Sequence, residues 1–437
     1  MNKLSISNRF KNILFWSIIS AAFIGPGTVT TAAAAGAGFG YSLIWALVFS
    51  IIACFILQEA SARITLISGR NLGQVLRDEY SGSVAGKILV WLTLTAIILG
   101  CLAFEAGNIL GSVAGIRLVN NSIPNYILVS LIGLIAFLVL FKGTIHQIAR
   151  ILGVVVAIMG FSFVLVAISI RHDISEIVMG GLIPVIPYGA ELIVLGLIGT
   201  TVVPYNIFLG SGIRHTQSLM EMRISMAIAI LLGGFISISI LLSATIIQGE
   251  FSFHSLAGAL QDKYGIFARL LLAVGLFGAG FSSAVTAALA AAITARSILG
   301  RSLISKEWGH DSLKFRIVWI FVLLTGVFFG LLNLQPVPII ILAQAMNGII
   351  LPVIAFVLFK LLNNNNVIPK EKQSGKALQY LTGLVVYLTF LAGISNILRA
   401  LSRAEILEMP ALIYVIVISA FLFSLAMISS LIKKSSR

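Results

Sequence analysis

Charged residues are scarce in this sequence. Only 10% of its 437 residues are Asp, Glu, Lys or Arg, whereas soluble globular proteins contain about 25%. Hydrophobic residues make up 59%. This composition excludes an ordinary soluble domain and predicts a polytopic membrane protein whose solvent is the lipid bilayer.

Cysteine is also rare. Cys54 and Cys101 are the only two, and both lie in apolar runs, which argues against a disulfide framework and favours packing roles. The five histidines fall in or beside loops, and none pairs with a cysteine or carboxylate at metal-ligand spacing. Because the sequence also lacks a nucleophile–base arrangement and a phosphate loop, we expect neither an enzyme nor a resident cofactor.

Long apolar segments recur along the whole chain. Windows of about 20 apolar residues mark membrane spans. Twelve such spans lie at roughly 12–36, 42–62, 86–112, 124–141, 147–170, 188–213, 223–248, 266–295, 315–333, 336–360, 377–398 and 410–432. The sequence therefore predicts an all-α polytopic membrane protein, a single transmembrane domain over residues 1–437 with only loops between the spans.

Positive charge is unevenly distributed between the two sides of these spans. The net charge is +14, and 23 of the 29 Lys and Arg residues fall on the side that carries both chain ends. By the positive-inside rule both termini are cytoplasmic, in the cell membrane. The basic start, 1–11, lacks a small-residue cleavage site and is interpreted as a cytoplasmic leader. The charge reflects topology and attraction to lipid headgroups, so no nucleic-acid partner is expected.

Two spans carry helix-breaking motifs, Gly25-Pro26-Gly27-Thr28 and Val203-Pro204-Tyr205-Asn206. Proline removes a backbone donor and glycine adds conformational freedom. In lipid, such a break is tolerated only where it faces protein or a water-lined cavity. Two breaks at corresponding positions of two halves indicate a transporter's central site, whereas either one alone could be a proline kink. The side chains on offer are Thr28, Thr30, Thr31, Thr200, Thr201, Tyr205 and Asn206.

Four more polar residues lie at membrane depth as two pairs, Glu105 with Asn108 and Gln344 with Asn347. The members of each pair are about one turn apart and should share a helix face. Glu105 is a candidate proton or ion relay; the alternative is a buried, protonated acid bonded to Asn108 or a backbone carbonyl. Gln344 and Asn347 either line the substrate site or join helices by hydrogen bonds.

Two further features concern packing. Glu59 and Arg63 are four residues apart near the cytoplasmic end of the second span, which predicts a structural ion pair. Gly and Ala clusters at 32–38 and 278–295 allow helix backbones to approach closely. Both features favour a compact bundle and leave the substrate open.

Together these motifs resemble the Nramp family of divalent-metal transporters, which have the LeuT-like fold. The similar stretches run from span one to span ten or eleven and include Gly25–Thr28, Gly36–Tyr41, Leu57–Arg63, Ser68–Arg70, Ile198–Asn206, Gly280–Ser283 and Leu342–Gln344. The resemblance implies two inverted five-helix repeats, about 12–170 and 188–360, followed by two additional helices over 377–437. It also implies ion-coupled symport by alternating access.

The sequence departs from the family pattern at the metal ligands. The family's span-one Asp and Asn positions, its carbonyl position and its span-six Met and His positions fall respectively at Gly25, Thr28, Ala22, Val203 and Tyr205. Its span-three Asp and Glu positions fall at Glu105 and Asn108. The resemblance therefore implies a substrate site without the usual carboxylate or Met ligands, formed by Ala22, Gly25, Thr28, Val203, Tyr205, Asn206, Gln344 and Asn347, with coupling through Glu105 and Asn108.

These departures bear on the substrate. A dication without a counter-charge at the membrane midplane costs at least about 3 kcal/mol, and loss of the thioether removes the softness that suits late transition metals. Mg²⁺ keeps its waters and accepts hydroxyl and carbonyl oxygens, with Glu105 as the nearest carboxylate. We therefore expect an inorganic cation, hard and Mg-like rather than Mn or Fe.

Two alternative functions stay open at this point. A small polar organic solute suits a site lined by Thr, Tyr and Asn, because half-helix N-termini receive substrate carboxylates in LeuT-like transporters. A non-transporting sensor resembles the Nramp-like domain of plant ethylene-signalling proteins, which add a large soluble tail where this chain stops at Arg437. We expect a monomer in the lipid bilayer in each case.

Overall fold

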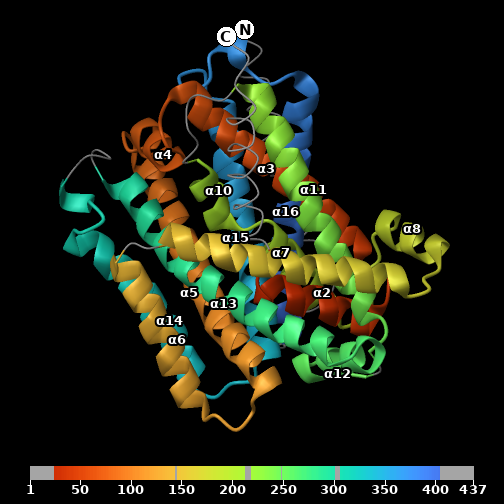
Figure 1. Ribbon diagram of the computed structural model, residues 1–437. Coiled ribbons are helices and arrows are strands. Elements are labelled where there is room, and N and C mark those ends of the chain that lie inside the picture. Colours follow the sequence, from red (N-terminus) through yellow and green to blue (C-terminus); the bar gives the residue numbers. More distant parts are fainter. Residues whose placement is uncertain (1–23, 143–144, 212–217, 248, 301–305, 404–437) are drawn as a thin grey trace.

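The computed structural model describes residues 24–142, 145–211, 218–247, 249–300 and 306–403 (Figure 1). Within these ranges the chain is helical and contains no strand. Nine of the described helices, counting the broken segment Glu191–Gly210 as one, are long and apolar enough to cross a membrane. The all-α membrane architecture predicted from the sequence is thus confirmed.

Helices occupy the first eleven predicted spans in order. They are α2 (Pro26–Phe39), α3 (Ile44–Ser68), α5 (Val84–Val119), α6 (Asn125–Lys142), α7 (Ile145–Ser169), α9 (Glu191–Thr201) with α10 (Pro204–Gly210), α11 (Leu219–Ala244), α13 (Ile266–Leu299), α14 (Leu313–Leu331), α15 (Pro336–Leu362) and α16 (Lys376–Arg403). The twelfth predicted span, 410–432, lies outside the described residues.

Short helices occupy connections that we predicted to be loops. They are α4 (Leu72–Tyr80), α8 (Ile174–Leu182), α12 (Phe253–Tyr264), η1 (Lys306–Trp308) and η2 (Lys370–Lys372). Each α-helix among them begins at a polar cap: Asn71, Asp173 or Ser252. A search for long apolar windows cannot find helices of nine to twelve residues, whereas the caps are signs that the sequence does carry.

The two longest helices, α5 and α13, run side by side through the bundle (Figure 1). Small residues bring their backbones into contact. A Cβ atom on Gly115 would lie 2.6 Å from the carbonyl oxygen of Ala273, and one on Gly280 would lie 2.7 Å from the carbonyl oxygen of Asn108. Glycine is therefore required at both positions, in keeping with the packing role expected for the Gly/Ala cluster at 278–295.

The short helices α2 and α9 are held inside the bundle by equally close contacts. A Cβ atom on Gly36 of α2 would lie 2.0 Å from the carbonyl oxygen of Leu241 in α11. A Cβ atom on Gly199 of α9 would lie 2.0 Å from the carbonyl oxygen of Gln344 in α15. Because backbone touches backbone at these points, α11 and α15 fix the position of both short helices.

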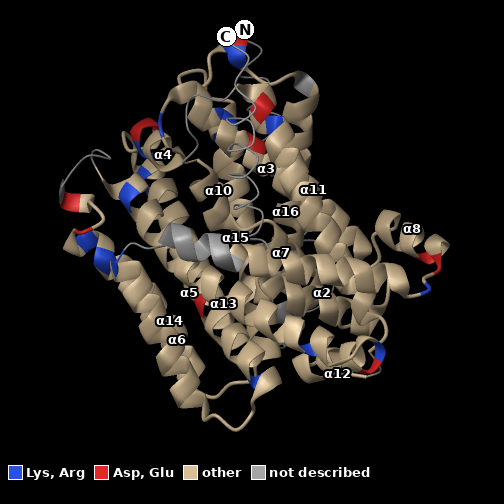
Figure 2. Ribbon diagram, in the orientation of Figure 1, with Lys and Arg blue, Asp and Glu red and all other residues tan. Residues whose placement is uncertain are grey.

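Charged side chains gather at the two ends of the bundle (Figure 2). Most described Lys and Arg residues lie at the end that carries α4. A smaller set lies at the opposite end, near α8 and α12. The division matches the predicted partition of Lys and Arg between two sides.

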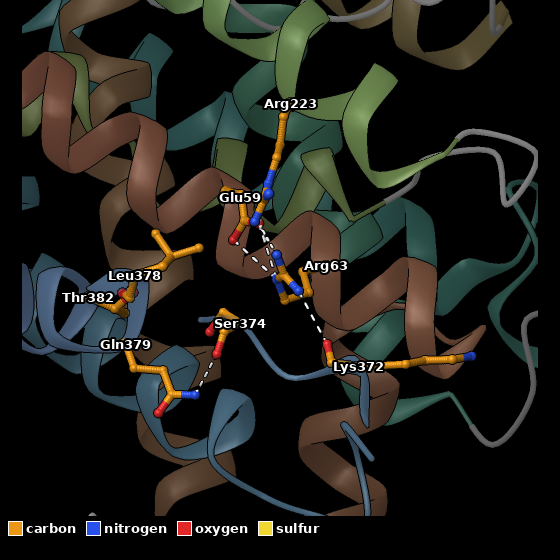
Figure 3. Close-up of polar contacts among 8 residues, drawn as sticks. All are labelled: Glu59, Arg63, Arg223, Lys372, Ser374, Leu378, Gln379 and Thr382. Carbon is orange, nitrogen blue, oxygen red and sulfur yellow. Dashed lines mark hydrogen bonds and ion pairs between the residues drawn. The ribbon is translucent and has the colours of Figure 1, made fainter. Parts of the chain in front are cut away.

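A buried ion cluster centred on Glu59 lies at the α4 end (Figure 3). The Glu59 carboxylate accepts hydrogen bonds from Arg63 Nη2 at 2.6 Å and from Arg223 Nη2 of α11 at 2.7 Å. Arg63 Nη1 also donates to the carbonyl oxygen of Lys372 at 3.3 Å. The predicted pair is confirmed, and its additional partners connect α3 to α11 and to the segment between α15 and α16.

Replacing Glu59 by Gln should lower the free energy of unfolding by about 3 kcal/mol, because removing one partner of a buried ion pair leaves an uncompensated buried charge. We expect the lower end of the usual range because the Arg223 side chain is 38% exposed. Thermal unfolding of the purified protein in detergent measures the change. Asp311→Asn is the control, since that carboxylate is 95% exposed and its loss should not shift unfolding. Equal shifts in the two variants would contradict a structural role for the cluster.

Candidate functional site

Each predicted break places a proline at the first position of a half-helix. Helix α2 begins at Pro26 after Gly25, which has extended backbone angles (φ −99°, ψ −178°). Helix α10 begins at Pro204 after Val203 (φ −83°, ψ 116°). Proline suits this position because its missing N–H would have no helical partner there. Ala22, proposed from the resemblance as a backbone ligand, lies outside the described residues.

A hydrogen bond joins the two broken segments. The Oγ1 atoms of Thr28 in α2 and Thr200 in α9 are 2.9 Å apart, and the two residues are only 1% and 2% exposed. Thr200 lies in the last turn of α9, where backbone carbonyls lack an intrahelical partner. The break therefore combines hydroxyl oxygens, a helix C-terminus and the positively polarised N-terminus of α2.

The other threonine hydroxyls near the breaks bond within their own helices. Thr30 Oγ1 donates to the carbonyl oxygen of Pro26 at 2.7 Å, and Thr31 Oγ1 donates to that of Gly27 at 2.8 Å. Thr201 Oγ1 likewise donates to a carbonyl oxygen one turn earlier, at 3.0 Å. Of the hydroxyls on offer in the sequence, Thr28 and Thr200 are thus the pair that meets across the break.

Gln344 of α15 reaches the same break. A Cβ atom on Gly27 would lie 2.0 Å from Gln344 Nε2, so the carboxamide lies directly against the first turn of α2. Gln344 is 1% exposed, and its Oε1 atom has no hydrogen-bond partner among the described residues. A buried amide oxygen without a partner is available to a ligand.

Asn347 lies in a different environment. Its Nδ2 atom donates to the carbonyl oxygen of Ala343 at 3.2 Å, and a Cβ atom on Gly100 of α5 would lie 2.6 Å from its Oδ1 atom. Gln344 and Asn347 thus lie on neighbouring parts of one helix face but contact different helices, α2 and α5. A step of three residues rotates the side chain by about 60° around the helix, which turns Asn347 toward α5.

The side chain of Glu105 lies against α14. A Cβ atom on Gly326 of α14 would lie 2.5 Å from Glu105 Cγ. Both carboxyl oxygens are buried and, within the described part of the chain, neither has a hydrogen-bond partner. The alternative of an acid bonded to Asn108 or a backbone carbonyl is thus wrong. The Nδ2 atom of Asn108 is also buried and unpartnered there, so both predicted coupling residues keep unused polar atoms.

Helix α10 contributes Tyr205 and Asn206, each 1% exposed. The Tyr205 ring packs edge-on against Phe104 of α5, with ring centroids 5.6 Å apart. The Nδ2 atom of Asn206 is buried and, among the residues described, has no hydrogen-bond partner. Tyr205 thus packs α10 against α5, while Asn206 keeps an unused amide beside the break.

One hydroxyl at the break was missed by sequence reasoning. Ser283 of α13 is 7% exposed, and a Cβ atom on Gly25 would lie 3.2 Å from its Oγ atom. The Gly280–Ser283 stretch entered the sequence comparison only as a family-like motif. Because α13 is unbroken and far along the chain from Gly25, no local pattern could place Ser283 beside the first break.

Gly27→Ala should lower the free energy of unfolding by about 1–3 kcal/mol, because the new methyl group would overlap the buried Gln344 carboxamide. Gly38→Ala in the same helix is the control, since nothing lies within 4 Å of its Cβ position. That change should be neutral or stabilising by up to about 1 kcal/mol, through helix propensity. Thermal unfolding compares the two, and equally mild effects would contradict the close contact.

Known proteins share both the sequence pattern and the fold. The Nramp model, described as natural resistance-associated macrophage protein-like, matches residues 17–399. The chain is 29% identical over 290 residues to the metal transporter nramp1 homolog of Dictyostelium discoideum. It is 29% identical over 307 residues to the divalent metal cation transporter MntH of Levilactobacillus brevis. These alignments cover 62% and 63% of this chain but 53% and 65% of those proteins.

Solved structures show the same arrangement of helices. The Eremococcus coleocola manganese transporter, in complex with an aromatic bis-isothiourea compound, has a TM-score of 0.71 at 18% identity, covering 97% of this chain and 94% of that one. A nucleobase–cation symporter in a closed conformation has a TM-score of 0.60 at 17% identity, covering 97% and 92%. These likenesses confirm the predicted LeuT-like fold. Since the family match extends over most of its length, the chain belongs to the Nramp family.

Proposed function

We propose that this protein is a secondary transporter that moves a hard divalent cation, Mg²⁺ foremost, across the cell membrane by alternating access. The observation that carries the proposal is the chemistry of the break. Its oxygens come from hydroxyl and amide groups, Thr28 and Thr200 with Gln344. Similarity to relatives that are named as metal transporters supports a metal ion as the substrate.

The ligand chemistry favours Mg²⁺ over softer ions. Mg²⁺ takes oxygen ligands, dehydrates reluctantly and usually keeps several waters. A thioether or imidazole would favour later transition metals, and at the second break the chain offers Val203 and Tyr205 instead. A hydrated hard cation therefore fits these neutral oxygens better than dehydrated Mn²⁺ or Fe²⁺ does.

Glu105 is the proposed source of compensating charge or of a proton relay, together with Asn108. Its carboxyl group is fully buried. A buried carboxyl group at membrane depth costs free energy, which makes Glu105 a candidate for a functional role. The other carboxylate on a described spanning helix that is as deeply buried, Glu59, is paired with Arg63 and Arg223. Glu105 would supply this charge from α5, beside the half-helix α10 that carries Tyr205.

The proposed transport cycle follows the expected symmetry of the chain. The two broken segments would belong to inverted repeats over about 12–170 and 188–360, with the two helices of 377–437 outside them. In the proposed orientation the basic α4 end faces the cytoplasm, together with both termini. The substrate site would then open alternately to the two sides of the membrane.

A small zwitterionic solute is the second candidate. One observation favours it: α2 and α10 both begin at the breaks, and the N-termini of half-helices receive substrate carboxylates in related folds. Such a solute would need no compensating carboxylate. Transport of a cation should therefore depend on the Glu105 carboxyl group, whereas transport of the solute should not.

Uptake into proteoliposomes tests the proposal. We expect saturable Mg²⁺ uptake that exceeds Mn²⁺ uptake, and Glu105→Gln should reduce it by about tenfold or more, a loss common for groups that support metal binding. Glu307→Gln, at a side chain 71% exposed, is the control and should leave uptake unchanged. Flux of an amino acid without cation flux would replace the proposal by the second candidate. Unaltered Mg²⁺ uptake in the Glu105 variant would remove the role of that carboxyl group.

A further inference from the structure

Gly25 brings no side chain to the first break, and a serine from another helix closely approaches its Cα. A Cβ atom built on Gly25 would lie 3.2 Å from Ser283 Oγ and 4.0 Å from Ser283 Cβ. The third of the three nearest atoms is the backbone nitrogen of Gly27, at 4.0 Å. The Ser283 hydroxyl of α13 is thus the side-chain oxygen that approaches the N-cap of α2 from the side.

Close helix packing fixes this position. One turn before Ser283, a Cβ atom on Gly280 would lie 2.4 Å from Ser112 Oγ of α5. On the same helix α5, a Cβ atom on Gly111 would lie 2.3 Å from Pro26 Cβ of α2. Helices α2, α5 and α13 therefore meet at the first turn of α2. The backbone carbonyl of Asn108, 2.7 Å from the Cβ position of Gly280, holds α13 against α5 at this level and so fixes the place of Ser283.

The hydroxyl itself is unused. Ser283 is 7% exposed, and its side chain makes no hydrogen bond with a described residue. Its neighbour Ser282 differs, because Ser282 Oγ donates to the carbonyl oxygen of Ala279 at 3.3 Å. Buried polar groups normally find partners. Ser283 Oγ and Gln344 Oε1, which is buried without a partner among the described residues, thus flank the start of α2 from two different helices.

We propose that Ser283 is a ligand of the transported cation and provides the oxygen that Gly25 cannot. This inference rests on the proposed function. Hydroxyl oxygen is a hard, neutral donor that suits Mg²⁺ or a water in its inner shell. Because Ser283 belongs to the unbroken helix α13 and Thr28 to the half-helix α2, the bound ion joins the two elements.

Paired alanine variants test this role. Ser283→Ala should weaken Mg²⁺ binding by about tenfold or more, measured by isothermal titration calorimetry and by Mg²⁺-induced thermal stabilisation of the full-length protein. Ser282→Ala removes a hydroxyl from the same helix and should leave the affinity unchanged. Unfolding without Mg²⁺ should be alike in the two variants, since neither hydroxyl bonds another helix.

A swap of the hydroxyl across the gap provides a second test. Gly25→Ser combined with Ser283→Ala returns an oxygen to the same space from α2 and should recover most of the lost affinity, whereas Gly25→Ala with Ser283→Ala should not. Mg²⁺ binding by the unaltered protein with no loss in Ser283→Ala would overturn the inference and leave the proposed function standing. Absence of Mg²⁺ binding and uptake in the unaltered protein would overturn both.

Discussion

Backbone hydrogen bonding inside the bilayer is the constraint on which this structure depends. A spanning helix satisfies its own N–H and C=O groups, and any break must find partners from elsewhere in the protein. Here prolines at 26 and 204 remove donors that would be unpaired. The Thr28–Thr200 bond closes one side of the gap. The carboxamide of Gln344 lies against the other. The polar side chains that lie at the break are thus the groups that the proposed ion would meet.

Glycine makes this arrangement possible. At Gly36, Gly115, Gly199 and Gly280 a methyl group would overlap the backbone of a neighbouring helix, so these positions bring α2 against α11, α5 against α13 and α9 against α15. In lipid, where burial of apolar surface does not drive helices together, such close contact is a main source of association. The polar side chains between the helices are therefore positioned by neighbours that cannot move away without losing that contact.

The parts of the fold that depend on local pattern could be predicted from the sequence, and those that depend on distant contacts could not. Apolar windows gave the spanning helices, and Pro26 and Pro204 marked both breaks because proline acts on its own turn. The capped helices α4, α8 and α12 were missed because they are too short to fill an apolar window. Arg223 beside Glu59, Ser283 beside Gly25, and the turn of Glu105 toward Gly326 follow from helix packing, which no single stretch of sequence encodes.

The neutrality of the break has an electrical consequence. On the described residues of α2, α9 and α10, the helix starts and ends that meet at the break carry no Asp, Glu, Lys or Arg. If the helix ends at the break move between two states, they displace no formal charge, because Glu191 of α9 lies at the end of that helix away from the break. A bound dication, in contrast, would move both of its charges through the membrane field, worth about 4.6 kcal/mol per 100 mV. The membrane potential would then favour inward movement of the loaded site.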